Sequence, residues 1–242
     1  MPDGLSLVSP VNAQPVFSSS ATQFHPIGTQ GKDRWGRFYR YARAGAVDLV
    51  VGNALQAPSQ LADHQAMVVD AAAIGDKSLN LTPGATAGAA DLYADGVAVI
   101  DTTPGLGYAY PIKTHLAITA STEFTVQLSG GVTVQVALTS SSRVSLYSNP
   151  YRGVIQAPTT MTNVPVGVAQ FIIVTTEYGW IGSGGLFGTL IQGTPGVGLG
   201  VGIPGSAAGS VAIHAVATIG LVGNMMDTGV DGLVQGVKWI LP

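Results

Sequence analysis

The sequence predicts an all-β protein, a β-sandwich or a β-barrel, and three observations support this prediction. The 242 residues include 33 glycines, and each glycine inside a helix costs about 1 kcal/mol relative to alanine. Charged residues make up only 10% of the chain, which argues against a helical bundle, a coiled coil or a charged disordered tail. Short apolar runs alternate with polar residues and end at glycine, proline or asparagine, as strands and turns do.

Residues 1–31 are expected to form an extended N-terminal arm, because no strand or helix period is sustained there. Pro10, Pro15 and Pro26 interrupt the segment. Its apolar side chains leave two interpretations open: a disordered terminus, or an arm that becomes ordered on a neighbouring subunit. On the second interpretation, deletion of residues 1–30 abolishes partner binding and leaves the fold intact.

Residues 32–150 are expected to form a first β-rich domain. Its strands are predicted at residues 47–51, 67–69, 78–81, 97–100, 108–113, 124–128, 132–138 and 143–147. Residues 124–128 and 132–138 flank Gly130 and Gly131, so we expect these two segments to pair as a hairpin. Turn signals at short intervals favour a sandwich or barrel over alternating βα units.

Residues 151–242 are expected to form a second, glycine-rich β domain, entered through the proline-rich segment 149–165. Its strands are predicted at residues 166–174, 196–203, 211–222 and 233–240. Residues 178–226 contain no Asp, Glu, Lys or Arg, yet prolines and a period of two indicate strands buried in protein rather than a membrane span. The predicted core comprises Val99, Val126, Leu128, Val134, Val136, Leu146, Ile172, Val174, Ile213 and Ile219.

Composition and motifs indicate no catalytic or cofactor chemistry. The chain has no cysteine, which excludes disulfides, thiolate nucleophiles and cysteine-based zinc sites. Its histidines are scattered, so we expect no metal site. The glycine-rich segments lack the helix and lysine of phosphate-binding loops, so no nucleotide cofactor is expected. With no hydrolase motif present, we expect a protein that is not an enzyme, and only a pocket with paired carboxylates would indicate a hydrolase.

Residues 32–43 combine basic and aromatic side chains. They read KDRWGRFYRYAR and hold five of the ten basic residues of the chain. Such a segment can stack bases and pair with phosphates, or it can contact carboxylates of another protein. The net charge of −3 gives no general attraction to nucleic acid or to an anionic membrane. Protein contact or a solvated face is therefore the favoured interpretation.

Several short motifs occur in a characteristic order. Residues 33–46 read DRWGRFYRYARAGA and residues 52–58 read GNALQAP, followed by PGLGYAYPIK at 104–113, SRVSL at 142–146, NPY at 149–151 and YGW at 178–180. Together they resemble a family of capsid decoration, or cement, proteins of tailed bacteriophages. The resemblance runs over residues 33–240 and leaves the arm uncovered. Residues 185–205 depart from the family pattern because they are unusually rich in glycine.

The resemblance implies a structural virion protein with a tulip-like β-barrel. Such a protein binds the outer surface of a phage head, often as a homotrimer, and holds neighbouring major capsid subunits together. It is assembled in the cytoplasm of the bacterial host, with no nucleic acid, membrane or cofactor as partner. With the arm and the basic segment, this implies contacts to the capsid or between subunits through Val8, Val11, Val16, Phe17, Phe24, Arg34, Trp35, Arg37, Tyr39 and Arg40.

A second hypothesis is a host-surface or carbohydrate-binding module displayed on the virion, like a head fibre. It requires exposed aromatic side chains along a groove, with Trp180, Tyr178 and Tyr147 as the candidates.

Overall fold

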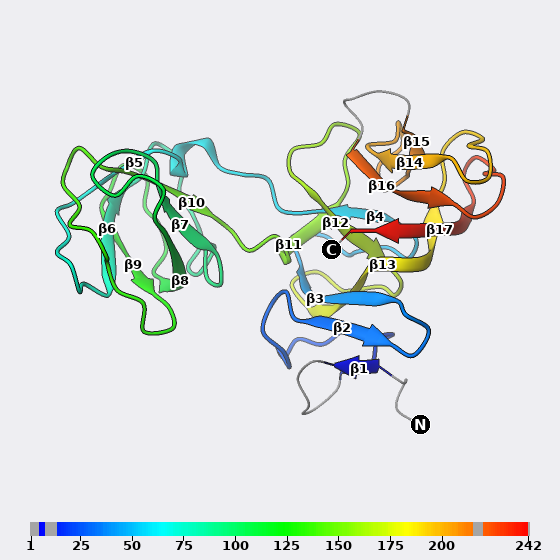
Figure 1. Ribbon diagram of the computed structural model, residues 1–242, viewed down its shortest axis with the longest axis horizontal. Helices are drawn as coiled ribbons and strands as arrows, with labels where there is room; N and C mark the ends of the chain where they lie inside the picture. The colour runs from blue at the N-terminus through cyan, green and yellow to red at the C-terminus, as the bar shows by residue number, and fades with distance from the viewer. Residues whose placement is uncertain (1–4, 8–13, 215–219, 242) are drawn as a thin grey trace. The chain divides into compact units, whose positions relative to one another are not determined.

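The computed structural model describes residues 5–7, 14–214 and 220–241, and these residues form an all-β fold with closed barrels, which confirms the predicted fold class. Within these ranges no helix is long and apolar enough to cross a membrane. The chain divides into two compact units (Figure 1). We call residues 60–149 the barrel unit, and residues 1–59 with 150–242 the sheet unit.

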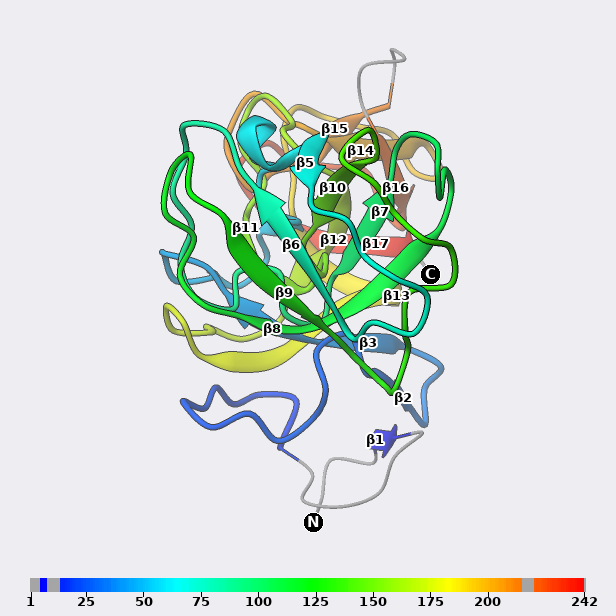
Figure 2. The ribbon, with the colours of Figure 1, turned by 90° about the vertical axis from the view of Figure 1, so that its left-hand side faces the viewer.

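The barrel unit is a closed six-stranded barrel with the order β10-β5-β6-β9-β8-β7 (Figure 2). Its strands are β5 (Met67–Val69), β6 (Ser78–Thr82), β7 (Val97–Ile100), β8 (Ala109–His115), β9 (Phe124–Leu128) and β10 (Arg143–Tyr147), after a short 3-10 helix at Ala62–His64. Burial alternates along β9, where Phe124, Val126 and Leu128 face the core and the residues between them face solvent. This alternation is the period of two that the sequence displays.

The predicted hairpin of residues 124–128 and 132–138 is wrong. Strand β9 pairs with β6 and β8 instead, and residues 132–138 contain no strand. Leu138 only forms an isolated bridge with Ala72. Gly130 and Gly131 both have positive φ and turn the chain away from β9, so Val134 and Leu138 reach the barrel core from a loop.

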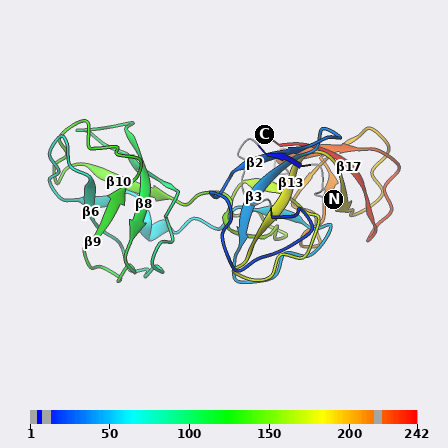
Figure 3. The same ribbon diagram turned by 90° about the horizontal axis from the view of Figure 1, so that it is seen from below.

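The sheet unit is an eleven-stranded sheet (Figure 3). In spatial order its strands are β1 (Leu5–Leu7), β2 (Gln30–Asp33), β3 (Phe38–Ala44), β11 (Arg152–Gln156), β4 (Ala54–Gln56), β12 (Pro165–Ala169), β13 (Tyr178–Leu190), β17 (Val234–Ile240), β16 (Gly220–Met225), β14 (Gly200–Ile203) and β15 (Ala212–Ile213). Strand β13 also pairs with β3, which closes the five strands from β3 to β13 into a ring.

The structure divides the chain differently from the predicted domains 32–150 and 151–242. Residues 32–59 belong to the sheet unit, and the barrel unit is inserted between residues 59 and 150. The reason is strand pairing across the insertion: β3 pairs with β11 and β13, and β4 pairs with β11 and β12. Only the boundary near residue 150 coincides with the predicted one.

The second half of the expected arm is part of the fold. Gln14, Val16 and Ile27 are buried, and the last two belong to the core cluster that contains Trp180 and Tyr41. The Trp180 indole Nε1–H donates to the Gln14 carbonyl at 3.0 Å, and the Tyr41 hydroxyl donates to Gln14 Oε1 at 2.7 Å. Deletion of residues 1–30 would therefore uncover the core, contrary to the expectation that it leaves the fold intact.

Four of the six core residues predicted in the barrel unit are buried, whereas none of the three described residues predicted for the core of the sheet unit is buried. Val126, Leu128, Val134 and Leu146 are buried, and Val99 and Val136 are partly buried. In the sheet unit, Ile172, Val174 and Ile213 are exposed, and Ile219 lies outside the described residues.

The physical reason for the error at residues 172 and 174 lies in which side chain faces inward. Residues 170–174 leave the sheet after β12, and only Ile173 pairs, in a bridge with Leu49. Ile173 points into the core and is buried. Its two neighbours therefore point outward, as alternation along an extended chain requires.

Candidate functional site

A hairpin in the sheet unit carries five of the ten predicted contact residues. Strands β2 and β3 pair antiparallel, with Lys32 opposite Phe38, and the turn at residues 34–37 joins them. Gly36 in this turn has a φ of 82°, a left-handed conformation that favours glycine. The Asp33 amide donates to the Arg37 carbonyl at 3.0 Å, which closes the turn.

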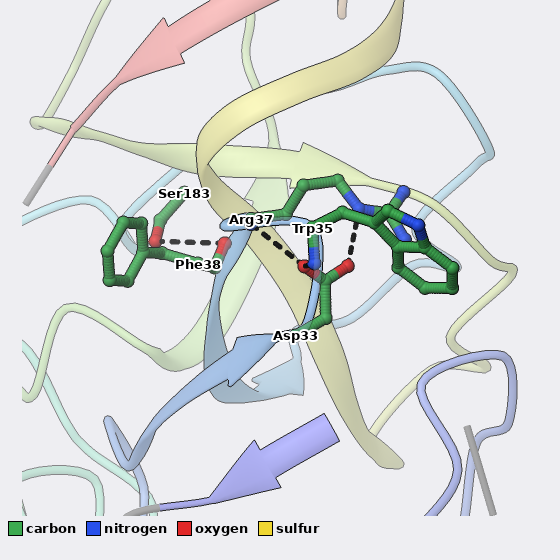
Figure 4. Close-up of polar contacts among 5 residues, drawn as sticks. All are labelled: Asp33, Trp35, Arg37, Phe38 and Ser183. Atoms are coloured by element: carbon green, nitrogen blue, oxygen red, sulfur yellow. Dashed lines mark hydrogen bonds and ion pairs between the residues drawn. The ribbon is translucent and has the colours of Figure 1, made fainter. Parts of the chain in front are cut away.

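Asp33 organises this turn (Figure 4). Its buried carboxylate accepts from Arg37 Nε at 2.6 Å and from the backbone amides of Trp35 and Arg37, each at 2.9 Å. Burial opposes ionisation of Asp33, but the hydrogen bonds and the charge of Arg37 outweigh it and hold the pKa of Asp33 below its usual value. A charged carboxylate therefore holds the turn and its arginine in one arrangement.

Trp35 is the exposed centre of the site. The residue is 63% exposed. The Arg34 guanidinium lies 4.3 Å from the ring centroid of Trp35, and the Arg37 guanidinium lies 5.6 Å from it. Arg37 lies equally close to the rings of Tyr39 and Phe187. These are cation–π distances, so the turn presents an aromatic surface flanked by two positive charges.

Strand β13 lies next to β3 and contacts the turn at residues 34–37. The Ser183 hydroxyl donates to the Phe38 carbonyl at 3.4 Å (Figure 4). Gly185 has a φ of 104°, and a Cβ there would lie 3.0 Å from Arg37 Cα. Glycine thus allows β13 to approach the turn closely. Trp35, Arg37 and Leu186 line an open hollow at this place.

The structure brings three of the predicted contact residues together, namely Arg34, Trp35 and Arg37. Phe17 and Phe24 are exposed elsewhere in the sheet unit. Arg40 is partly buried, donates to the Gly28 carbonyl at 3.1 Å and lies over the Tyr151 ring.

Two of the predicted contact residues do not support a contact surface, and two others are not described by the structure. Val16 and Tyr39 are buried in the core of the sheet unit, so they are inaccessible to a partner of the folded chain. Burial raises the pKa of Tyr39 to about 12. Val8 and Val11 lie outside the described residues.

Sequence reasoning missed the contribution of β13. Gly185, Leu186 and Phe187 come about 150 residues after the turn that they contact. The only local signal was the run of glycines and apolar residues after Trp180. Such a run identifies a strand that permits close approach, but it does not identify the segment that approaches.

The aromatic residues proposed for carbohydrate binding do not form a groove. Trp180 is fully buried in the sheet unit, Tyr178 is partly buried and stacks on Tyr41, and Tyr147 belongs to the barrel unit. Trp180 therefore serves the core rather than a sugar-binding surface.

His64 and His115 of the barrel unit both contact the buried Tyr93. The Tyr93 hydroxyl lies 2.6 Å from His64 Nδ1, and the Tyr93 amide donates to His115 Nε2 at 3.0 Å. The second nitrogen of each ring lies within hydrogen-bond distance of a carbonyl, that of Thr86 or Leu116. Both rings therefore act as structural links between loops. Across the described ranges, no three His, Cys, Asp or Glu side chains gather closely enough to hold a metal ion.

One carboxyl pair occurs on the barrel unit. Asp70 and Glu123 are both exposed, and a hydrogen bond between their side chains raises the pKa of Glu123. The charge of Asp70 acts in the same direction, because two neighbouring carboxylates disfavour the ionisation of one of them.

Comparisons of the chain with protein-family models, with curated proteins and with solved structures find no match.

Proposed function

We propose that the chain is a structural virion protein without enzymatic activity, a capsid decoration or cement protein. It binds the outer surface of a tailed-phage head, as a homotrimer, and stabilises contacts between major capsid subunits. The order of the sequence motifs supports this proposal. The observation that carries it is the exposed Trp35 between Arg34 and Arg37.

The chemistry of this turn suits a protein partner. Tryptophan and arginine are the residues most enriched among those that dominate the binding energy of protein interfaces. Asp33 holds the turn in place before binding, so little conformational entropy is lost when the partner docks. Two guanidinium groups beside the ring suit a shell surface that presents carboxylates.

Several copies acting together need only modest individual affinity. An oligomer that engages several shell subunits turns each further contact into an intramolecular step, so the overall attachment exceeds that of one contact. Such an attachment resists the outward pressure of packed DNA without any catalytic step.

The test is co-sedimentation of the full chain with empty heads of the phage whose genome encodes it. We expect the wild-type chain to sediment with the heads and Trp35→Ala to bind about 30-fold more weakly, as for a central interface residue worth about 2 kcal/mol. Val197→Ala is the matched control, because Val197 lies in the same unit and is also 63% exposed. A wild-type chain that stays in the supernatant overturns the proposal. If Trp35→Ala and Val197→Ala bind the heads equally well, Trp35 is not part of the contact.

A further inference from the structure

The turn at residues 34–37 and strand β13 form an open hollow with largely apolar walls. Its lining residues are Trp35, Arg37 and Leu186, and its volume is about 430 Å³, which is enough for one large apolar side chain. Figure 4 shows the Trp35 ring next to the Arg37 side chain. Trp35 is 63% exposed and Leu186 is 49% exposed, so both apolar walls are accessible to a partner.

Basic groups lie on both sides of this hollow. Arg34 and Arg37 lie beside the Trp35 ring. On the other side of β13, the exposed Lys238 lies directly opposite Leu186 in the register of β13 and β17. Directly opposite residues of an antiparallel pair lie on the same face of the sheet. Apolar walls between separated positive charges are the result.

The positive charge of this surface is not offset by neighbouring carboxylates. Asp33 is the acidic partner of Arg37, whereas within the described ranges neither Arg34 nor Lys238 forms an ion pair. The whole chain carries a net charge of −3, so the positive surface is a local departure from the overall charge. Such a departure attracts an acidic partner to this place rather than to the rest of the molecule.

The carboxylates that precede β17 do not alter this balance. Asp231 accepts from the Gly193 amide at 2.7 Å, and Asp227 accepts from Gln235 Nε2 at 3.3 Å. Both residues come before the first residue of β17. Lys238 lies about 13 Å further along the strand from that first residue, so its charge remains available to a partner.

An acidic protein segment with one large apolar side chain suits this arrangement. The apolar side chain enters the hollow and shields Trp35 and Leu186 from water. Carboxylates on either side of it meet the guanidinium groups at one edge and Lys238 at the other. A nucleic acid strand suits it less well, because bases stack on aromatic side chains and the wall formed by Leu186 is aliphatic.

We infer that this hollow binds an acidic segment of the partner protein through one large apolar side chain flanked by carboxylates. We call the surface the acidic-segment site; its residues are Arg34, Trp35, Arg37, Leu186 and Lys238. The inference rests on the proposed function for its premise that the turn contacts a protein. It adds the chemistry of the partner and two contact residues, Leu186 and Lys238.

The test is binding of synthetic peptides to the full chain, followed by the fluorescence anisotropy of a label on the peptide. The first peptide has one leucine between two runs of aspartate. In the second peptide asparagines replace the aspartates, and in the third a serine replaces the leucine. We expect the first peptide to bind at least tenfold more tightly than either of the others.

Two variants separate the charged and the apolar contributions. We expect Lys238→Gln to weaken binding of the first peptide about threefold, as for an exposed ion pair, and to leave the asparagine peptide unchanged. Leu186→Ser should weaken the first peptide about fivefold and leave the serine peptide unchanged. Lys113→Gln and Leu199→Ser are the matched controls, because Lys113 is an exposed lysine of the barrel unit and Leu199 is 49% exposed, as Leu186 is.

Tryptophan fluorescence gives a second readout. Of the three tryptophans, Trp180 and Trp239 are buried, so acrylamide in solution quenches chiefly Trp35. We expect the first peptide to protect Trp35 from acrylamide, and Leu186→Ser to remove this protection.

The outcomes separate this inference from the proposed function. Equal binding of the three peptides, or an oligothymidylate that protects Trp35 better than the first peptide, overturns the inference. Attachment to phage heads that Trp35→Ala weakens but Lys238→Gln and Leu186→Ser do not also overturns it, and leaves the proposed function in place. Selective binding of the first peptide by a chain that does not attach to heads supports the acidic-segment site and contradicts the proposed function.

Discussion

His25 is the single residue whose environment most clearly limits the conditions under which the sheet unit is stable. The imidazole is buried between the rings of Tyr41 and Trp180, at centroid distances of 5.1 and 5.2 Å. Its Nε2 atom is buried without a hydrogen-bond partner. Burial lowers the pKa of His25 below the ordinary value of 6.5, because the apolar rings do not solvate the charged form.

This environment predicts that the sheet unit loses stability in acid. The folded pKa of His25 lies below the unfolded value of 6.5, so the unfolded chain binds the proton more tightly. No stability is lost above the unfolded pKa, and the free energy of unfolding falls as the pH drops below it toward the folded pKa. We expect His25→Phe to reduce this fall, as measured by urea unfolding between about pH 7.5 and about pH 5.

His214→Gln is the matched control for this prediction, because His214 belongs to the same unit and is exposed. It should leave the pH dependence of the wild-type chain unchanged. The same pH dependence in His25→Phe as in the wild-type chain would contradict the prediction.

Strand β13 and the segment before β2 are the elements on which the sheet unit most depends. Strand β13 pairs with β12, β3 and β17, so it connects the closed ring of strands with the C-terminal strands. Residues 14–29 cover Trp180 of this strand through Gln14 and His25. The N-terminal segment is therefore a structural cover of the core from Gln14 onward.

Two truncations distinguish residues 14–30, which cover the core, from residues 1–13. Deletion of residues 1–13 leaves Gln14, Val16 and Ile27 in place. Deletion of residues 1–30 removes the buried Val16 and Ile27, each worth about 1.5–3 kcal/mol, which together approach the whole stability of a marginal domain. We expect the shorter deletion to melt close to wild type and the longer one to be largely unfolded, as followed by circular dichroism. Equal melting temperatures would show that residues 14–30 are not part of the core.

At the scale of the whole molecule, the barrel unit is an insertion with its own closed core. Among the residues that the structure describes, its six strands pair only with one another, and its core cluster contains only residues of this unit. Near its start Gln60 Nε2 donates to the Leu146 carbonyl at 2.5 Å. The positions at which the chain enters and leaves the barrel unit thus lie close together, as is common for inserted domains.

An excised barrel unit should therefore fold by itself. We expect residues 60–149 to unfold cooperatively in urea and to resist protease. The matched comparison is the fragment 32–150, because it contains β3 and β4 without β11, β12 and β13, with which they pair. Protease should trim residues 32–59 from this fragment and leave the barrel. A fragment 60–149 without a cooperative transition would contradict the independence of the unit.

The amino-acid sequence by itself determined the fold class and the position of many strands. Glycine content, low charge and the alternation of apolar and polar residues in segments such as Phe124–Leu128 are properties of the local sequence. They therefore predict strands without knowledge of the tertiary structure. The cluster of basic and aromatic residues at 32–43 was also visible in the sequence, because its residue types lie within a few positions of one another; the turn that exposes residues 34–37 was not predicted.

Only the tertiary structure decided which strands pair and which apolar residues are buried. Strand β3 pairs with β13 across the inserted barrel unit, and Gly185 and Leu186 meet a turn about 150 residues earlier in the chain. In the tertiary structure Trp180 and Tyr39 are core residues, whereas Leu186 and Val234 are exposed. Apolar side chains look alike in sequence, and which of them escape water depends on long-range strand pairing that no local pattern encodes.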